Sequence, residues 1–169
     1  MRVRPMTQSD GDRVVEIYGL AIKSGHATFQ DDPGTWESWD QGHLTECRLV
    51  ACDDDGMVIG WAGLSGVSNR CVYRGIAEIS VYVDPNYQGQ GVGRSLLAAL
   101  ISSSEEHGIW SLEAGIFPEN KASLALHHAL GFETVGLKKR IGRMAYGPMA
   151  GQWRDVMLLQ RRSSMVGVD

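Results

Sequence analysis

The spacing of hydrophobic residues predicts a strand followed by a helix in the middle of the chain. From Ile76 to Val83 hydrophobic and polar residues alternate, so Ile79 and Val81 share one face of a strand while Glu78 lies on the other. From Gly91 to His107 hydrophobic residues recur every three or four positions, which is the period of an amphipathic helix. The pattern therefore predicts a strand with one hydrophobic face, a short turn and a helix that packs against the sheet.

Similar signals divide the rest of the chain into short elements. We expect the remaining strands at Val3–Pro5, Leu49–Cys52, Val58–Leu64, Ser111–Phe117, Thr134–Ile141 and Trp153–Gln160. We expect the remaining helices at Asp10–Lys23, Thr35–Leu44 and Asn120–Leu130, with Ser9 or Asp10 as the N-cap of the first and Gly131 ending the last. Strands, crossing helices and a terminal hairpin together indicate an α/β domain around one mixed sheet.

Length and composition favour one globular domain. The chain has 169 residues, of which 43% are apolar and 21% are charged. These values are ordinary for a single soluble domain with a sizeable core. We therefore expect one domain over residues 1–169, with residues 163–169 as a flexible tail.

Charge and hydrophobicity argue against two classes of partner. A net charge of -4 and a pI near 5.7 do not favour nucleic-acid binding, which normally requires a basic surface. No apolar run approaches the ~20 residues of a membrane helix. The segment Met1–Met6 also lacks the hydrophobic core of a secretion signal. We expect a cytoplasmic protein that binds neither nucleic acid nor a membrane.

Neither the cysteines nor the acidic residues predict a metal site. Cys47, Cys52 and Cys71 lack the Cys-x-x-Cys spacing of zinc sites, so buried structural thiols are the simpler interpretation. Asp53–Gly56 lies between two predicted strands, where Asp-Gly favours a hairpin turn, and the rest of a calcium-loop spacing is missing. We therefore expect no bound metal.

A glycine-dense loop, Gln88–Gly93, precedes the predicted helix. Backbone N–H groups at a helix N-terminus lack internal partners, and the helix dipole adds positive charge there, so such a loop can bind phosphate groups. A dinucleotide fingerprint Gly-x-Gly-x-x-Gly would require glycine in place of Arg94, and the Gly-Lys-Ser/Thr of nucleotide hydrolases is missing. An ordinary turn is the alternative for a motif this short.

The loop resembles the pyrophosphate-binding loop of the GNAT superfamily of acyl-CoA-dependent N-acetyltransferases, whose pattern is Arg/Gln-x-x-Gly-x-Gly/Ala. Gln88, Gly91 and Gly93 match this pattern. The segment Asn120–Phe132 is similar to a second GNAT signature, Asn-x-x-Ala/Ser ending in Leu-Gly-Phe. The resemblance implies a single α/β domain of the GNAT type, with a mixed, mostly antiparallel central sheet flanked by helices. It also implies acetyl-CoA as co-substrate.

Within the superfamily the chain resembles the phosphinothricin and methionine sulfoximine N-acetyltransferases. Many GNAT enzymes have a tyrosine as the acid for the CoA thiolate where this chain has His127, and that subfamily has the pattern Leu-His-Glu here. Other segments similar to subfamily patterns are Ala27–Phe29, Tyr73–Arg74, Glu78–Val83, Gly142 and Gln152–Val156. The chain departs from the subfamily at Gly75–Ala77, at His128 and over Arg143–Gly151, which leaves the exact amine open.

The resemblance implies a set of residues that bind acetyl-CoA. They are Val81, Tyr82, Val83, Gln88, Gly89, Gln90, Gly91, Val92, Gly93, Arg94, Ser95, Asn120, Ser123 and His127. The backbone N–H groups of Val81 to Val83 would stabilise an oxyanion. Asn120 is expected near the pantetheine arm and can also cap a helix. His127 is either a proton donor to the CoA sulfur or a packed, orienting side chain.

Glu78 is the predicted general base and, with Phe29, Tyr73 and Arg74, a predicted substrate-binding residue. An α-ammonium group with a pKa near ~8 is mostly protonated at neutral pH, so a carboxylate within reach is useful. Arg74 could bind a substrate carboxylate with two parallel hydrogen bonds. The alternatives are an exposed or paired strand glutamate, a solvent-facing arginine and an aromatic core residue at Phe29.

These features predict transfer of the acetyl group of acetyl-CoA, by direct attack, to the α-amine of a small amino acid or a toxic glutamate analogue. Phosphinothricin, methionine sulfoximine and methionine sulfone are examples of such analogues. Two alternatives stay open: an acetyltransferase for another amine, such as a polyamine or a protein N-terminus, and a non-catalytic acyl-CoA-binding domain. The resemblance further implies a homodimer, although the sequence alone reveals no interface.

Overall fold

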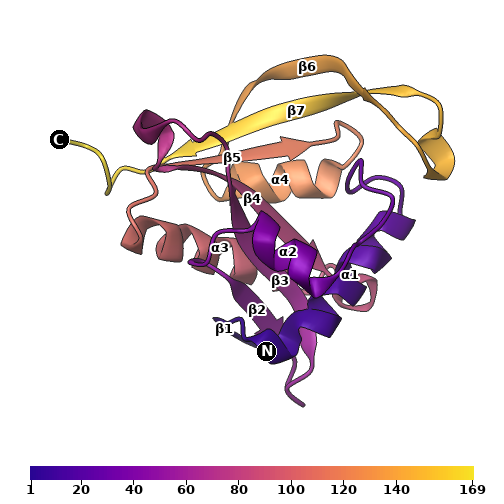
Figure 1. Cartoon of the computed structure of the whole chain (residues 1–169), viewed down its shortest axis with the longest axis horizontal. Helices are drawn as coiled ribbons and strands as arrows, with labels where there is room; N and C mark the ends of the chain where they lie inside the picture. The colour runs from indigo at the N-terminus through magenta and orange to yellow at the C-terminus, as the bar shows by residue number, and fades with distance from the viewer.

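The computed structural model describes residues 1–169 as one open sheet with helices packed on both faces (Figure 1). The strands are β1 (Arg2–Pro5), β2 (Leu49–Cys52), β3 (Val58–Gly66), β4 (Ile76–Val83), β5 (Ser111–Ile116), β6 (Glu133–Arg143) and β7 (Trp153–Arg162). The α-helices are α1 (Gly11–Lys23), α2 (Trp36–Gly42), α3 (Val92–Glu106) and α4 (Lys121–Ala129). The predicted α/β class is confirmed, and the predicted elements differ from the observed ones only near their ends.

The sheet has seven strands in the order β1-β2-β3-β4-β5-β7-β6. Every neighbouring pair is antiparallel except β4 and β5, which are parallel. The β4–β5 pairing is short, because it runs only from Ile76–Ser111 to Glu78–Glu113. Since β4 continues to Val83, the two strands separate beyond the glutamate pair. The sheet is therefore mixed and opens in its middle.

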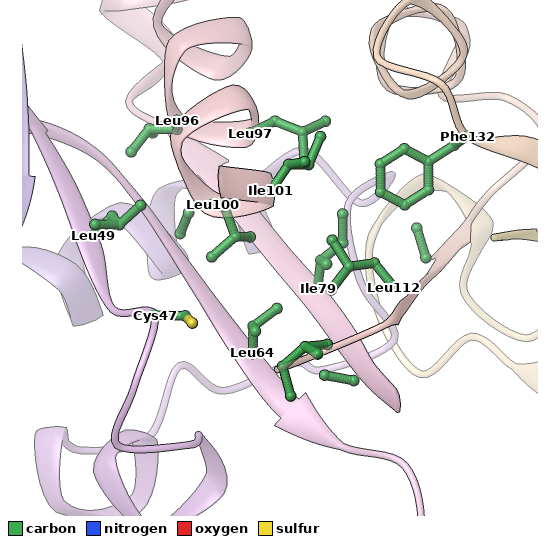
Figure 2. Packing of buried hydrophobic residues seen from close by; sticks show 14 of the residues in the cluster. Cys47, Leu49, Leu64, Ile79, Leu96, Leu97, Leu100, Ile101, Leu112 and Phe132 are labelled. Carbon is green, nitrogen blue, oxygen red and sulfur yellow. The ribbon is translucent and has the colours of Figure 1, made fainter. Parts of the chain in front are cut away.

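The larger hydrophobic core lies between α3 and one face of the sheet. Leu96, Leu97 and Leu100 of α3 are fully buried, and they belong to one cluster with sheet residues such as Leu64 and Leu112 (Figure 2). Burying a leucine side chain stabilises the fold by roughly 1.5–3 kcal/mol. This packing fixes the axis of α3, and with it the direction in which the N-terminus of the helix points.

A second core covers the opposite face of the sheet. Val14 and Ile17 of α1, Trp39 of α2 and Trp61 of β3 are buried in this cluster. The Tyr18 ring packs edge-on against the Tyr82 ring of β4, with 4.9 Å between the ring centroids. As predicted from the alternating pattern, the two faces of β4 therefore have different neighbours, and the face that carries Tyr82 lies under α1.

The cap of α1 differs in detail from the prediction. Asp10 occupies the N-cap position, but its side chain makes no capping hydrogen bond to the helix. Its carboxylate instead pairs with Arg4 at 2.8 Å and accepts a hydrogen bond from the Thr7 backbone N–H at 2.7 Å. A guanidinium group is a stronger partner than a helix N–H, which explains the choice. The predicted end of α4 is confirmed, since Gly131 has the left-handed φ of 86°.

The hairpin of β6 and β7 forms a long arm that extends along the top of the view in Figure 1. Because β6 is an edge strand, the arm leaves several large apolar side chains exposed. They are Val135, Leu137, Ile141 and Trp153, which are 59%, 41%, 51% and 52% exposed. Three of these residues lie on the edge strand β6, and Trp153 lies on β7 beside it.

The last residues lie beside the end of β7. Arg162 donates hydrogen bonds to the backbone carbonyls of Val166 and Gly167, and Gly167 lies against Trp110. The flexibility expected of residues 163–169 stays a prediction. None of the helices combines the length and the hydrophobicity that crossing a membrane requires.

Candidate active site

Two adjoining cavities open where β4 and β5 separate. The larger has a volume of about 840 Å³ and is lined by the second half of β4, the glycine loop, the end of β5 and the first turns of α4. The smaller has a volume of about 300 Å³ and contains Glu78, the last β4 residue paired with β5. Gly115 of β5 lines both cavities, so a ligand in one can reach a ligand in the other.

The glycine loop has the backbone conformation that its sequence requires. Gly89 has φ 73° and Gly91, the N-cap of α3, has φ 83°. A Cβ atom at either position would meet no atom within 4 Å, so space does not require glycine here. The left-handed backbone does, because residues with a Cβ atom rarely adopt it. Gly93 differs, since its Cβ would lie 3.3 Å from Leu126.

The backbone N–H groups from Gly89 to Arg94 donate no hydrogen bond within the protein. The first bonded amide of the helix is that of Ser95, which donates to the Gly91 carbonyl at 3.0 Å. Unpaired N–H groups at a helix start, together with the helix dipole, provide partial positive charge without a lysine. The loop can therefore bind an anionic group such as a phosphate or diphosphate.

Most of the predicted cofactor residues line the larger cavity together. They are Val81, Tyr82, Val83, Gln88, Gly89, Gly91, Val92, Gly93, Arg94, Asn120, Ser123 and His127. Gln90 and Ser95 belong to the loop and the first helix turn but do not line the cavity. The Gln90 side chain instead donates to the Asn86 carbonyl at 3.2 Å, although its backbone N–H stays unpaired.

The edge of β4 that faces the larger cavity consists of backbone. Beyond Glu78, β4 remains paired with β3, as in the Ala62–Val81 and Trp61–Tyr82 pairs, but has no partner on the β5 side. The side chain of Tyr82 packs between Tyr18 and Trp61, and burial raises the pKa of its hydroxyl group. As expected, the side chains here contribute packing, and the unpaired main chain faces the cavity.

Asn120 and His127 lie on the α4 side of the larger cavity. The Asn120 side chain accepts a hydrogen bond from the Ser123 N–H at 3.1 Å, so it caps α4 as expected. His127 is 5% exposed, and its Nδ1 lies 2.7 Å from the Ser123 carbonyl oxygen. That contact assigns the proton to Nδ1 and leaves Nε2 as an acceptor. Burial lowers the pKa of His127. These observations favour a neutral, orienting side chain over a proton donor.

Glu78 shares the smaller cavity with a second carboxylate and one lysine. Glu113 of β5 and Lys138 of β6 line it as well. Burial is the main cause that raises the pKa of Glu78, and the neighbouring Glu113 raises it further, while Lys138 lowers it. Glu78 nevertheless keeps contact with solvent. A carboxylate with a raised pKa is a stronger base, and the open cavity lets an amine approach it.

Phe29 forms a wall of the smaller cavity, which also contains Glu78. Its segment follows α1, and its ring packs edge-on against Phe117, with 4.9 Å between the ring centroids. Gly142 of β6 permits this position, because a Cβ there would lie 2.7 Å from the Phe29 ring. The absence of a side chain at Gly142 therefore allows the Phe29 ring to lie close to the β6–β7 arm.

Tyr73 and Arg74 do not meet Glu78. They lie at the short turn before β4, where both are exposed, and neither lines either cavity. The Arg74 guanidinium lies 5.9 Å from the centroid of the Trp110 ring instead. Tyr73 and Arg74 are close to Glu78 in the sequence but not in the pocket, because the first residues of β4 separate Glu78 from the turn. Within one chain, the structure does not bring these two predicted substrate residues to the pocket.

Glu113 and Lys138 also line the smaller cavity but were not predicted from the sequence. Glu113 alternates with the buried Leu112 and Ala114, so it lies on the polar face of a central strand. The alternation alone predicts that Glu113 lies on the polar face of the strand. Only the β4–β5 register shows that this position is beside Glu78. Lys138 lies on an edge strand among other exposed charges, and no sequence signal distinguishes it.

Arg154, a buried arginine on β7 whose side chain is 0% exposed, was not predicted as a site residue either. It donates to the Gly25 carbonyl at 2.7 Å and to Glu119 at 3.2 Å, and it lies 3.2 Å from Nδ1 of His26. Its guanidinium carbon lies 3.6 Å from the centroid of the Phe117 ring. Arg154 therefore ties the segment after α1 to the β5–α4 connection. One sequence signal could have identified Arg154, because the subfamily pattern has leucine at this position.

Comparisons with known proteins agree with this geometry. The model of the acetyltransferase (GNAT) family matches residues 12–132. A phosphinothricin N-acetyltransferase of Alcaligenes faecalis is 34% identical, over 94% of this chain and 81% of its own length. An L-methionine sulfoximine/L-methionine sulfone acetyltransferase of Salmonella typhimurium is 30% identical, over 95% of this chain and 93% of its own.

A solved structure with the same fold contains a bound cofactor. The GNAT superfamily phosphinothricin acetyltransferase of Sinorhizobium meliloti, in complex with AcCoA, superimposes with a TM-score of 0.86 and 31% sequence identity. The match covers 99% of this chain and 91% of that one. The likeness therefore extends over both cavities and the β6–β7 arm.

Proposed function

The chain belongs to the GNAT acetyltransferase family and is an acetyl-CoA-dependent N-acetyltransferase; we propose that its acceptor is the α-amine of a small amino acid. The proposal includes toxic glutamate analogues such as phosphinothricin and methionine sulfoximine, which the names of two relatives specify. The smaller cavity, of about 300 Å³, suits a ligand of this size.

The observation that carries the proposal is the row of unpaired N–H groups from Gly89 to Arg94. Coenzyme A contains a diphosphate, and these amides offer it several donors at a helix N-terminus. Gln88 and Arg94 add side chains at the two ends of the row. We assign the diphosphate to this loop, and the pantetheine arm to the gap between β4 and β5 beside Asn120 and Ser123.

Acetyl-CoA supplies an acyl thioester whose carbonyl carbon forms a C–N bond with the amine while its C–S bond breaks, releasing the thiol. The protein contributes hydrogen-bond donors for the oxyanion, a base for the amine and a side chain that orients the ligand. Successive N–H groups of a strand point to opposite sides, and the Asp84 N–H donates to the Ile59 carbonyl of β3. The N–H groups of Val81 and Val83 therefore point to the unpaired side of β4, where they are offered to the oxyanion, already oriented before charge develops.

Glu78 accepts one proton of the ammonium group, directly or through water, and the second proton, lost as the amide forms, passes to the departing sulfur. His127, as a neutral acceptor, orients the ligand.

Phe29 and Glu78 are the proposed acceptor-binding residues within one chain. Phe29 provides an apolar wall, and Glu78 provides the charged group that an ammonium meets on arrival. Tyr73 and Arg74 lie outside this pocket, so the proposal gives them no contact with an acceptor bound in the same chain.

We also propose a homodimer in a reducing, cytoplasmic setting. The exposed apolar side chains Val135, Ile141 and Trp153 on the β6–β7 arm support a partner surface. Cys47 and Cys52 are buried as expected, but Cys71 is exposed, and an exposed free thiol suits a compartment in which thiols stay reduced. Light scattering behind a sizing column should give twice the chain mass of 18.5 kDa. A mass of one chain at every concentration would contradict the dimer.

A thiol-release assay over a panel of amines tests the activity. The panel contains methionine sulfoximine, phosphinothricin, common amino acids, a polyamine and a peptide with a free N-terminus. We expect turnover of amino-acid α-amines well above that of the polyamine and the peptide. Binding of CoA without turnover of any amine would reduce the protein to an acyl-CoA-binding domain. Preferred turnover of the polyamine or the peptide would replace the proposed acceptor by another amine.

A further inference from the structure

The acceptor pocket contains one carboxylate more than the proposed reaction uses. Three charged side chains line it: Glu78, Glu113 and Lys138. None of the three takes part in an ion pair or a side-chain hydrogen bond. They are therefore free to interact with a ligand.

The strand register explains why the two carboxylates share a face. Glu78 and Glu113 are paired residues on neighbouring parallel strands, so their side chains leave the sheet on the same side. Like charges in this arrangement repel each other and weaken the pairing. Lys138 can neutralise one of them, but the pocket keeps an excess negative charge.

The excess negative charge of the pocket restricts which amino-acid side chain it can accept. With the α-ammonium at Glu78 and the α-carboxylate at Lys138, two of the three charged groups are matched. Glu113 is left facing the remaining part of the ligand, which is the side chain. A carboxylate without a partner in a partly dehydrated pocket favours a hydrogen-bond donor or a cation and disfavours another anion.

Building on the proposed function, we propose that Glu113 determines acceptor specificity by selecting amino acids whose side chains end in a donor or a cation. Amides, sulfoximine N–H groups and amines belong to the favoured class. Carboxylates and phosphinates belong to the disfavoured class. Lys138 serves both classes alike, because it binds the α-carboxylate that they share.

Two pairs of acceptors isolate this effect. Methionine sulfoximine and phosphinothricin have similar tetrahedral ends, but the first carries a neutral N–H where the second carries a negative oxygen. Glutamine and glutamate form a second pair, which differs only by an amide in place of a carboxylate. For each pair, the ratio of kcat/KM values measures the discrimination at the side-chain end.

In the wild-type protein we expect kcat/KM to favour the donor-bearing member of each pair by about tenfold or more. Glu113→Gln removes the charge with little change of shape and should reduce the ratio by about tenfold. Glu106→Gln is the matched control, because Glu106 is exposed at the end of α3, outside both cavities. It should leave the ratio unchanged. Added salt should narrow the wild-type ratio, since it screens the repulsion.

The outcomes separate the inference from the function on which it rests. Equal wild-type kcat/KM within the pairs, or an unchanged ratio in Glu113→Gln while turnover continues, would overturn the role of Glu113 and leave the acetyltransferase intact. The salt series on the wild type gives the same decision if Glu113→Gln fails to fold. Absence of turnover with every amine would remove the proposed acceptor chemistry itself, and the inference with it.

Discussion

The two adjoining cavities are lined by different parts of the polypeptide. The larger is bordered at the glycine loop by unpaired backbone N–H groups from Gly89 to Arg94. The smaller depends on charged side chains, Glu78, Glu113 and Lys138, from three different strands. A site made of backbone follows from local conformation and is the same for any acyl donor with a diphosphate. A site made of side chains can change its ligand through single substitutions.

The largest expected effect tests the smaller cavity, which depends on charged side chains. Glu78→Gln should lower kcat about 10²- to 10⁴-fold, which is the usual contribution of a general base. Acetyl-CoA affinity should hardly change, because Glu78 lies outside the larger cavity. Steady-state kinetics and calorimetric titration with CoA measure the two quantities. A variant with unchanged kcat across pH would exclude Glu78 as the base.

The next effect concerns Arg154, which ties the segment after α1 to the β5–α4 connection. Arg154→Met should lower the free energy of unfolding by about 1–3 kcal/mol, because the buried carbonyl of Gly25 and the Glu119 carboxylate lose a charged donor. We also expect KM for the amine to rise, since the segment that carries Phe29 is no longer fixed. Urea denaturation and kinetics measure these changes.

Arg2→Met is the matched control for Arg154. Arg2 lies exposed on β1, so its replacement should change stability by less than about 0.5 kcal/mol. If Arg154→Met were as stable as the control variant, the connecting role of Arg154 would be wrong.

A third, smaller effect tests the glycine loop, whose unpaired backbone N–H groups border the larger cavity. Gly91→Val places a branched residue at φ 83°, which costs on the order of 1–2 kcal/mol. Open space around Gly91 means that the strain comes from the backbone alone. We expect about tenfold weaker acetyl-CoA binding with an unchanged preference among amines. Gly66→Val, at the exposed end of β3 and also in open space, should bind acetyl-CoA normally.

The smallest effect is a shift of the pH profile. Glu78 must be deprotonated to act as a base, so kcat/KM should fall as pH drops below its raised pKa. Because Glu113 raises that pKa, Glu113→Gln should move the acid limb to lower pH. Because Lys138 lowers it, Lys138→Met should move the limb to higher pH. Shifts in the opposite directions would show that the limb belongs to another group.

The sequence predicted the fold and the larger cavity well for a physical reason. Alternation in β4 and the helical period of α3 reflect contacts within a few residues, so local pattern suffices to place both. The left-handed glycines and the unpaired helix start are local as well. Asn120 as the cap of α4 follows from the same kind of reasoning.

The smaller cavity was predicted less completely. Glu78 and Phe29 were expected in it, and both line it. Tyr73 and Arg74 were expected beside them, but the short turn before β4 leaves both exposed elsewhere. Glu113 was not singled out, because its position beside Glu78 depends on a pairing between segments that are 35 positions apart.

By itself, then, the sequence determined the strand, the turn and the helix that leave backbone amides unpaired at the larger cavity, since these depend on backbone conformation and nearest neighbours. Only the tertiary structure decided which charged side chains line the smaller cavity. Those side chains come from β4, β5 and β6, which are separated in the chain by helices and turns and are brought together only in the sheet, where β7 lies between β5 and β6. Electrostatic interactions act through space, so the balance of charge in the pocket exists only once the strands have paired.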